Sequence, residues 1–143
     1  RINLKNMKNL FCFSLFVFAF VICVNGCSED SNVTQTNTVT NRVPDKPKNP
    51  SPADSSENID PNVVMILSWQ CSDPDENDTL KYDVYISNSL PVGNTPIATG
   101  LLNPSYGLGI VAPNTSYFWK VVATDNNGGS STGNTWRFKT GSR

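Results

Sequence analysis

The sequence contains no histidine among its 143 residues. Histidine is the commonest general base near neutral pH, a very common metal ligand and the middle member of the serine and cysteine nucleophile systems. Its absence removes the usual means of acid–base, metal-assisted and nucleophilic catalysis. We therefore expect a protein that is not an enzyme.

Cysteine is scarce in the part of the chain that we expect to fold. Of the four cysteines, Cys12 and Cys23 lie in an apolar N-terminal run, and Cys27 lies just after it. Cys71 alone remains, and a single cysteine cannot close a disulfide within a domain. Packing must therefore stabilise the fold, and we interpret Cys71 as a small buried apolar residue.

Basic residues are too few for a nucleic-acid-binding surface. The whole chain has 11 basic and 12 acidic residues. Residues 1–26 hold three of the basic residues and no acid, which leaves 8 basic against 12 acidic residues and a net charge of −4 in the remainder. Nucleic-acid-binding proteins usually present a basic patch. We therefore expect no nucleic-acid partner.

The N-terminal region has the pattern of a signal peptide. Translation is expected to start at Met7, which Lys8 follows, and residues 10–24 are apolar apart from Ser14. A membrane-spanning helix needs about 20 apolar residues, whereas a cleaved leader has a basic start and a shorter apolar run. Residues 1–26 are therefore predicted to be a signal peptide.

The apolar run ends in the four residues Val24-Asn25-Gly26-Cys27, which resemble the lipobox of bacterial lipoproteins. The resemblance implies cleavage before Cys27, a diacylglycerol on its thiol, and an acyl chain such as palmitate on its new amino group. Each buried methylene contributes about 0.8 kcal/mol, so several chains hold a protein on a bilayer without a transmembrane helix. Asn25 is an uncommon residue at its place in the motif. The alternative is an ordinary cleaved leader with a free Cys27 thiol.

Residues 28–46 are rich in Ser, Thr and Asn and contain no aromatic residue. Such a segment buries too little apolar surface to offset the entropy lost on ordering, so we expect residues 27–46 to form a lipidated, flexible tether. Ser28 resembles an outer-membrane sorting residue, and the acids Glu29 and Asp30 resemble the surface-export signals of some Gram-negative lipoproteins. The expected location is the bacterial cell envelope, on the outer membrane and exposed at the surface.

Four later segments alternate apolar and polar residues with the period of two that half-buried strands show. Between the last two, residues 125–129 supply the Asp, Asn and Gly residues of a hairpin connection. Short strands at regular spacing, without a helical pattern, predict an all-β sandwich. The predicted inward positions are Met65, Leu67, Trp69 and Cys71; Tyr82, Val84 and Ile86; Tyr117, Trp119, Val121 and Ala123; Trp136 and Phe138.

The chain from about residue 44 to 141 resembles a fibronectin type III domain. The residues that carry the resemblance are the proline-rich segment 47–52, Leu67-x-Trp69, Tyr82-x-Val84-x-Ile86 and Val111-x-Pro113-x-Thr115-x-Tyr117, a tyrosine corner. The resemblance implies an immunoglobulin-like, seven-stranded sandwich over residues 47–141, in which the Tyr117 hydroxyl bonds upstream backbone. Val111 stands where the family usually has leucine, and no RGD-type loop is present.

Two loops at one predicted end of the sandwich are rich in oxygen ligands. Asp73, Asp75 and Asp78 lie in one loop, and Asp125 lies in the other. Calcium binds closely spaced carboxylates on loops, so these four residues form a candidate calcium site, although they lack EF-hand spacing. The alternative is a pair of solvated turns in which Asp and Asn bond their own backbone.

A second candidate site lies on the outward face of two neighbouring strands. Tyr85 and Phe118 are predicted to form an aromatic surface beside Lys120 and Arg137, and such surfaces bind sugars and proteins. Cross-strand packing that only stabilises the sheet is the alternative.

These observations predict a membrane-anchored, non-catalytic envelope lipoprotein whose sandwich is a binding, adhesion or spacer module. Its expected partners are the membrane, through the lipid, and envelope proteins or glycans. No cofactor is expected other than the lipid on Cys27 and the candidate calcium ion. One alternative is the N-terminal accessory module of a larger surface enzyme, for example a glycan-degrading one, of which this sequence is a part. A structural envelope protein without a ligand is a third hypothesis.

Overall fold

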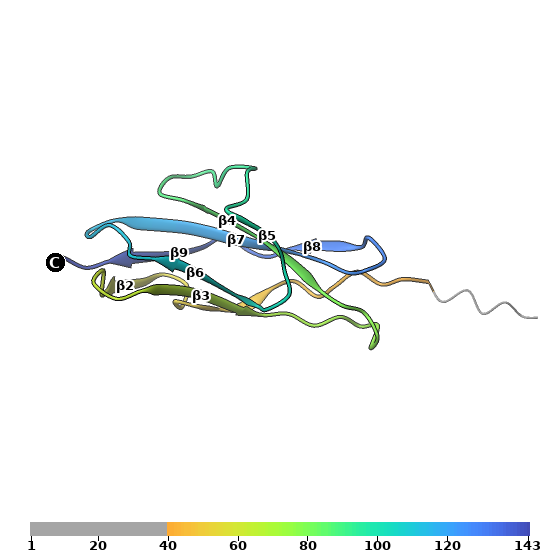
Figure 1. Ribbon diagram of the computed structural model, residues 1–143. Coiled ribbons are helices and arrows are strands. Elements are labelled where there is room, and N and C mark those ends of the chain that lie inside the picture. The colour runs from red at the N-terminus through yellow and green to blue at the C-terminus, as the bar shows by residue number, and fades with distance from the viewer. Residues whose placement is uncertain (1–39) are drawn as a thin grey trace, which may run out of the picture. The chain divides into compact units, whose positions relative to one another are not determined.

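The computed structural model describes residues 40–143, which contain nine strands and no helix (Figure 1). Residues 40–143 belong to one compact unit. The predicted signal peptide, Cys27 and the tether up to residue 39 lie outside the described residues. The strands are β1 (Lys48–Ser51), β2 (Ser56–Ile59), β3 (Met65–Gln70), β4 (Lys81–Ser87), β5 (Ala98–Leu101), β6 (Ser105–Gly109), β7 (Ser116–Thr124), β8 (Ser130–Thr132) and β9 (Trp136–Thr140).

The strands form two sheets that pack face to face. One sheet has the order β1-β3-β6, and the other has the order β2-β9-β7-β4-β5 with β8 paired to β7. Figure 1 shows β3 and β6 in one layer and β4, β7 and β9 in the other. The expected all-β sandwich is confirmed.

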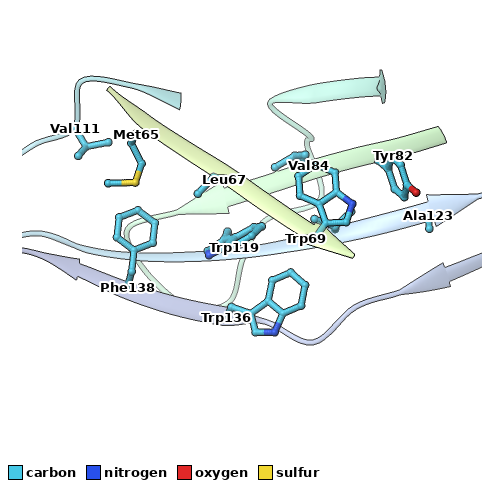
Figure 2. Close-up of a cluster of buried hydrophobic side chains, with 11 residues drawn as sticks. Met65, Leu67, Trp69, Tyr82, Val84, Val111, Trp119, Ala123, Trp136 and Phe138 are labelled. Atoms are coloured by element: carbon cyan, nitrogen blue, oxygen red, sulfur yellow. The ribbon is translucent and has the colours of Figure 1, made fainter. Parts of the chain in front are cut away.

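The core between the sheets is built around three tryptophans (Figure 2). The Trp119 ring is fully buried, and its centroid lies 4.7 Å from that of Trp136 and 6.4 Å from that of Trp69. Aromatic rings in such tilted and edge contacts bury large apolar areas. Trp119 and Trp136 belong to one sheet, and Trp69 belongs to the other. The predicted alternation holds at most positions, whereas Cys71, Ile86 and Tyr117 are only partly buried against the core. Ten of the predicted inward side chains are buried, namely Met65, Leu67, Trp69, Tyr82, Val84, Trp119, Val121, Ala123, Trp136 and Phe138.

The first and last of the seven expected strands are each broken in two, which gives the nine observed. β1 pairs with β3 in one sheet, whereas β2 pairs in parallel with β9 in the other. Between them, Pro52 has no N–H for a ladder, and Ser55 has a φ of 62°, outside the extended region. The chain therefore leaves one sheet and continues in the other. The final strand is interrupted between β8 and β9.

The tyrosine corner forms as predicted. The Ala112 N–H donates to the Tyr117 hydroxyl at 3.0 Å. A second hydroxyl, that of Thr140 on β9, donates to the Ala112 carbonyl at 2.7 Å and accepts the Thr115 N–H at 2.9 Å. The connection from β6 to β7 is thus held by side chains from two different strands.

The sandwich begins earlier in the chain than residue 47. Pro44 is buried, the Asp45 N–H donates to the Ser72 carbonyl at 2.9 Å, and the Ser131 hydroxyl donates to the Asp45 carbonyl at 2.9 Å. The prediction that residues 41–46 belong to the flexible tether is therefore wrong. Their polar groups find partners on the sandwich, which composition alone does not reveal.

Cys71 differs from its predicted state. It lies just after β3 and is half-buried rather than buried, and its thiol donates to the Asp45 carbonyl at 3.1 Å. Burial raises the pKa of the Cys71 thiol, and the negative charge of Asp45 adds to that shift. Cys71 thus lies just after the end of β3, in contact with Asp45 of the segment 41–46.

Candidate functional site

Three of the four predicted calcium ligands lie together on the connection between β3 and β4. Carboxylate oxygens of Asp73, Asp75 and Asp78 all lie within 4.8 Å of one another. The three side chains are half-buried. Such a group of oxygen atoms has the chemistry that calcium prefers.

The Asp75 carboxylate already has a cationic partner. The Arg42 N–H donates to its Oδ2 at 2.7 Å, and the Arg42 Nε and Nη2 lie 2.9 and 2.8 Å from its Oδ1. The Arg42 guanidinium also donates to the Pro74 carbonyl. These hydrogen bonds, with the backbone one first, hold the pKa of Asp75 below its ordinary value. A calcium ion at Asp75 would have to compete with this guanidinium.

Asp73 has one satisfied and one unsatisfied oxygen. Its Oδ1 accepts the Asp75 N–H at 2.8 Å, which is an Asx-turn contact. Its Oδ2 is buried and has no hydrogen-bond partner among residues 40–143. The cluster therefore contains the Asp-to-backbone turn that was the alternative to a calcium site, and also one carboxylate oxygen, Asp73 Oδ2, that is free to bind an ion.

The fourth predicted ligand, Asp125, is not part of this group. Its Oδ1 accepts the N–H groups of Asn127 and Gly129 at 2.8 and 2.7 Å, and its Oδ2 accepts the Asn41 amide at 2.9 Å. Asp125 is only 5% exposed. The Asn41 amide, followed by the backbone donors, lowers the pKa of Asp125. Its carboxylate organises the turn after β7, so the prediction that it completes a calcium site is corrected.

Gly129 is required by this arrangement. A Cβ added at this position would lie 2.4 Å from Asp125 Oδ2 and 2.9 Å from the Asn41 amide nitrogen. Only glycine lets the backbone approach the buried carboxylate so closely. The two loops are also joined through Asn127, whose amide donates to both Asp78 oxygens at 3.0 and 2.9 Å.

These contacts define a clamp, by which we mean Asn41 and Arg42 bound to Asp125 and Asp75. Sequence reasoning missed both members of the clamp on the N-terminal side. The sequence contains one indication for Arg42, because it is the first charged residue after the uncharged residues 31–41. The calcium site stays a prediction, now restricted to the three aspartates of one loop.

The structure brings together the residues of the second candidate site. Tyr85 and Lys120 are register partners on β4 and β7, and the Lys120 Nζ lies 5.1 Å from the centre of the Tyr85 ring. Phe118 is the register partner of Arg137 on β9. The Arg137 guanidinium pairs with Glu57 at 2.8 Å and thereby lowers the pKa of Glu57. All four residues are half-exposed, so both the binding surface and the cross-strand packing interpretations fit.

Among residues 40–143, no helix is long and apolar enough to cross a membrane. Cys27, the predicted lipidation site, lies outside the described residues. Its modification stays a prediction.

No protein-family model matches the sequence, and no curated protein matches it. Among solved structures, the chain is similar to an α-L-rhamnosidase from Dictyoglumus thermophilum, with a TM-score of 0.55 and 20% identity over 71% of this chain. The chain spans only 12% of that enzyme.

Two smaller structures are also similar. One is an Fn3-like protein from Clostridium thermocellum, with a TM-score of 0.49 and 23% identity over 71% of this chain and 98% of that one. The other is the fibronectin type-III domain of human fibronectin type III domain containing protein 3, with a TM-score of 0.48 and 20% identity over 74% and 94% of the two chains.

Proposed function

We propose that this protein is a non-catalytic lipoprotein of the bacterial envelope, anchored through Cys27, which presents its sandwich as a binding or spacer module. The observation that carries the proposal is the order of features along the chain. A basic start and an apolar run end at the lipobox-like Val24–Cys27 sequence, and a polar segment then leads into a sandwich. Several acyl chains on Cys27 would anchor the protein without a membrane-spanning helix.

The clamp is the point at which the segment that follows the proposed anchor joins the sandwich. Asn41 binds Asp125 and Arg42 binds Asp75, so a pull from the lipid is transmitted to two loops at one end of the sandwich. The segment from Cys27 to Asn41 has 14 peptide steps, which span about 50 Å when fully extended.

The partners that fit this arrangement are the membrane, through the lipid, and envelope proteins or glycans that reach the exposed sandwich. Tyr85, Phe118, Lys120 and Arg137 offer aromatic and cationic groups on one outer face. The outer-membrane location is supported by Ser28 after the cysteine. Nucleic acid remains an unexpected partner because acids outnumber bases after residue 26.

Fractionation of cells that express the full chain tests the anchor. We expect the wild-type protein in the detergent-rich phase of a phase-separating detergent and the Cys27→Ser variant in the aqueous phase. Cys71→Ser is the matched control, because it removes the thiol of the folded part without touching the lipobox. A Cys27→Ser protein that partitions like the wild type would refute lipid anchoring at this residue.

A second candidate function is an accessory module of a larger surface enzyme, such as a glycan-degrading one. The similarity to 12% of an α-L-rhamnosidase favours it, because a similar sandwich there is one part of a much larger chain. An antibody raised against the sandwich would decide between the two functions on an immunoblot of native cell envelopes. A band far larger than the 143-residue chain supports the accessory module, and a band at the size of the mature chain supports the lipoprotein alone.

A further inference from the structure

The basic residues of the sandwich are concentrated on one outer face. Buried residues alternate with the others along β4, β7 and β9, for example Val84, Val121 and Phe138, so the residues between them point away from the core. Register partners in antiparallel strands lie on the same face of a sheet. Four of the eight basic residues in the range 40–143 therefore share the outer face of these strands: Lys81, Lys120, Arg137 and Lys139.

This face is positively charged although the chain is acidic overall. Two acids accompany its four bases, namely Asp83 on β4 and Glu57, which meets the face at Arg137. The remainder of residues 40–143 contains four bases and eight acids. The charges of the sandwich are thus segregated, with the surplus of positive charge on this sheet.

Both acids of this face already have partners. The Asp83 Oδ1 accepts the Gly100 N–H at 2.9 Å, and a Glu57 oxygen lies 2.8 Å from the Arg137 Nη2. Within residues 40–143, no ion pair involves the three lysines of the face, which are Lys81, Lys120 and Lys139. Three ammonium groups are therefore available to an anionic ligand.

Two aromatic rings lie among these cations, each directly opposite one of them. Tyr85 is the register partner of Lys120, whose Nζ lies 5.1 Å from the centre of the Tyr85 ring. Phe118 is the register partner of Arg137. Phe118 and Lys120 are two residues apart on β7, which is about 7 Å along a strand. The face thus presents the same pair, one ring beside one cation, at two successive positions.

We propose that this face binds an acidic polysaccharide, by which we mean a chain of sugars that carry carboxylate groups. The carboxylates pair with Lys120 and Lys139 through charge-assisted hydrogen bonds. The apolar C–H faces of the sugar rings pack on the Tyr85 and Phe118 rings, which provide flat apolar surfaces. This inference rests on the proposed binding role of the sandwich and names the class of ligand for it.

The arrangement of rings and cations favours this ligand over an acidic protein segment. Positive charge alone complements any anion. The paired rings additionally require a flat apolar surface beside each anionic group. A sugar acid has a ring and a carboxylate in the same unit, whereas an Asp or Glu side chain has a carboxylate without a ring. The contact of Lys120 with Tyr85 is weak at a site that solvent reaches, so a carboxylate competes with it for the ammonium.

The test is binding of the full-length chain, purified in detergent, to three immobilised acidic polysaccharides: polygalacturonate, alginate and hyaluronate. A chelator in the buffer prevents binding through calcium bridges at the aspartate cluster. We expect at least one of the three to bind, with an affinity that falls as salt is added. The carboxyl-reduced form of that polysaccharide keeps the sugar rings without their charge, and it should bind at least about tenfold more weakly, because both ammonium contacts are lost.

Variants assign the binding to this face. Lys120→Gln and Lys139→Gln should each weaken binding about threefold, as expected for an exposed charge pair. The double variant should weaken it about tenfold, because effects at separate sites add. Lys48→Gln is the matched control, since it removes the same charge from the exposed Lys48 on β1 of the other sheet and should leave the affinity unchanged. Melting temperatures establish that each variant is folded.

The aromatic part of the proposal has its own readout. Phe118→Leu keeps an apolar side chain and removes the ring, so it should weaken binding to the polysaccharide and leave any binding to polyglutamate unchanged. Four results would overturn the proposal: no binding to any of the three polysaccharides, equal binding of the acidic and carboxyl-reduced forms, lysine variants that behave like Lys48→Gln, or polyglutamate bound as tightly as the polysaccharide. The last result would identify the ligand as an acidic protein segment.

Failure of this proposal is distinguishable from failure of the proposed function. Polysaccharide binding is measured on purified protein, so a negative result removes the ligand class and leaves the acylation of Cys27 untouched. An unmodified Cys27 likewise leaves the charges and rings of this face in place.

Discussion

Thr140→Val is the substitution whose effect follows most directly from the structure. Thr140 is 1% exposed, and its hydroxyl accepts the Thr115 N–H at 2.9 Å and donates to the Ala112 carbonyl at 2.7 Å. Valine has nearly the same shape, so the core stays filled while both hydrogen bonds disappear. The change thus isolates the polar contribution of this hydroxyl to the connection between β6 and β7.

The magnitude follows from the two groups that lose their partner. A buried donor or acceptor left unsatisfied costs about 1–3 kcal/mol. Water reaches the exposed Ala112 more easily than the half-buried Thr115, so we expect the two together to cost about 2–4 kcal/mol of unfolding free energy. For a domain of about 100 residues, each kcal/mol lowers the melting temperature by roughly 4–8 °C. The expected fall is therefore roughly 8–32 °C.

Thermal and urea unfolding, followed by tryptophan fluorescence, measure this effect. Thr132→Val on β8 is the matched control, because it makes the same chemical change at an exposed position and should stay within about 0.5 kcal/mol of wild type. Tyr117→Phe should cost about 0.5–1.5 kcal/mol. It should also couple to Thr140→Val, since the two hydroxyls bond the N–H and the carbonyl of the same residue, Ala112. A Thr140→Val protein that melts with the control would refute the reasoning.

Three further predictions concern the clamp and the residues beside it. The pKa of Asp125 is lowered in the folded state, so its carboxylate stabilises the fold above its ordinary pKa of 3.8 and loses that contribution as the pH falls through the lower folded value. Asp125→Asn should therefore show a smaller loss of stability when the protein is titrated with acid. An unchanged dependence of stability on pH would contradict the assignment. If calcium binds the three aspartates, it should raise the melting temperature, and the rise should be larger in Arg42→Ala because the competing guanidinium is gone. No rise in either protein would refute the calcium hypothesis. Alkylation of Cys71 should be slow at neutral pH because burial raises the pKa of its thiol. If the clamp holds the segment containing Asp45 over this thiol, alkylation should be faster in Arg42→Ala than in the wild type. Equal rates in the two proteins would argue that the clamp does not cover Cys71.

The features that the sequence predicts well are those with a local signature. Alternation of period two placed Leu67, Val84 and Trp119 in the core, because each strand repeats its inward face every second residue. The tyrosine corner was predictable for the same reason, since Tyr117 bonds Ala112 only five residues away. Such contacts leave a pattern within one short window.

The features that the sequence did not reveal join distant segments. Arg42 meets Asp75 across 33 residues, and Asn41 meets Asp125 across 84. No periodic pattern in the sequence indicates these pairs. An aspartate that binds a metal and one that accepts backbone N–H groups also cannot be distinguished from the sequence alone. Thr140 was likewise unremarkable, because its partners come from the loop before β7. These contacts become visible only once the topology places the ends of different strands together.

The central claim is that acyl chains on Cys27 hold a non-catalytic sandwich at the envelope. Mass spectrometry of the N-terminal peptide, released from protein purified from native membranes, tests it most directly. The account predicts a chain that begins at Cys27 with acyl groups on both the thiol and the amino group. A chain that begins elsewhere, or an unmodified thiol at residue 27 in a water-soluble protein, would contradict it.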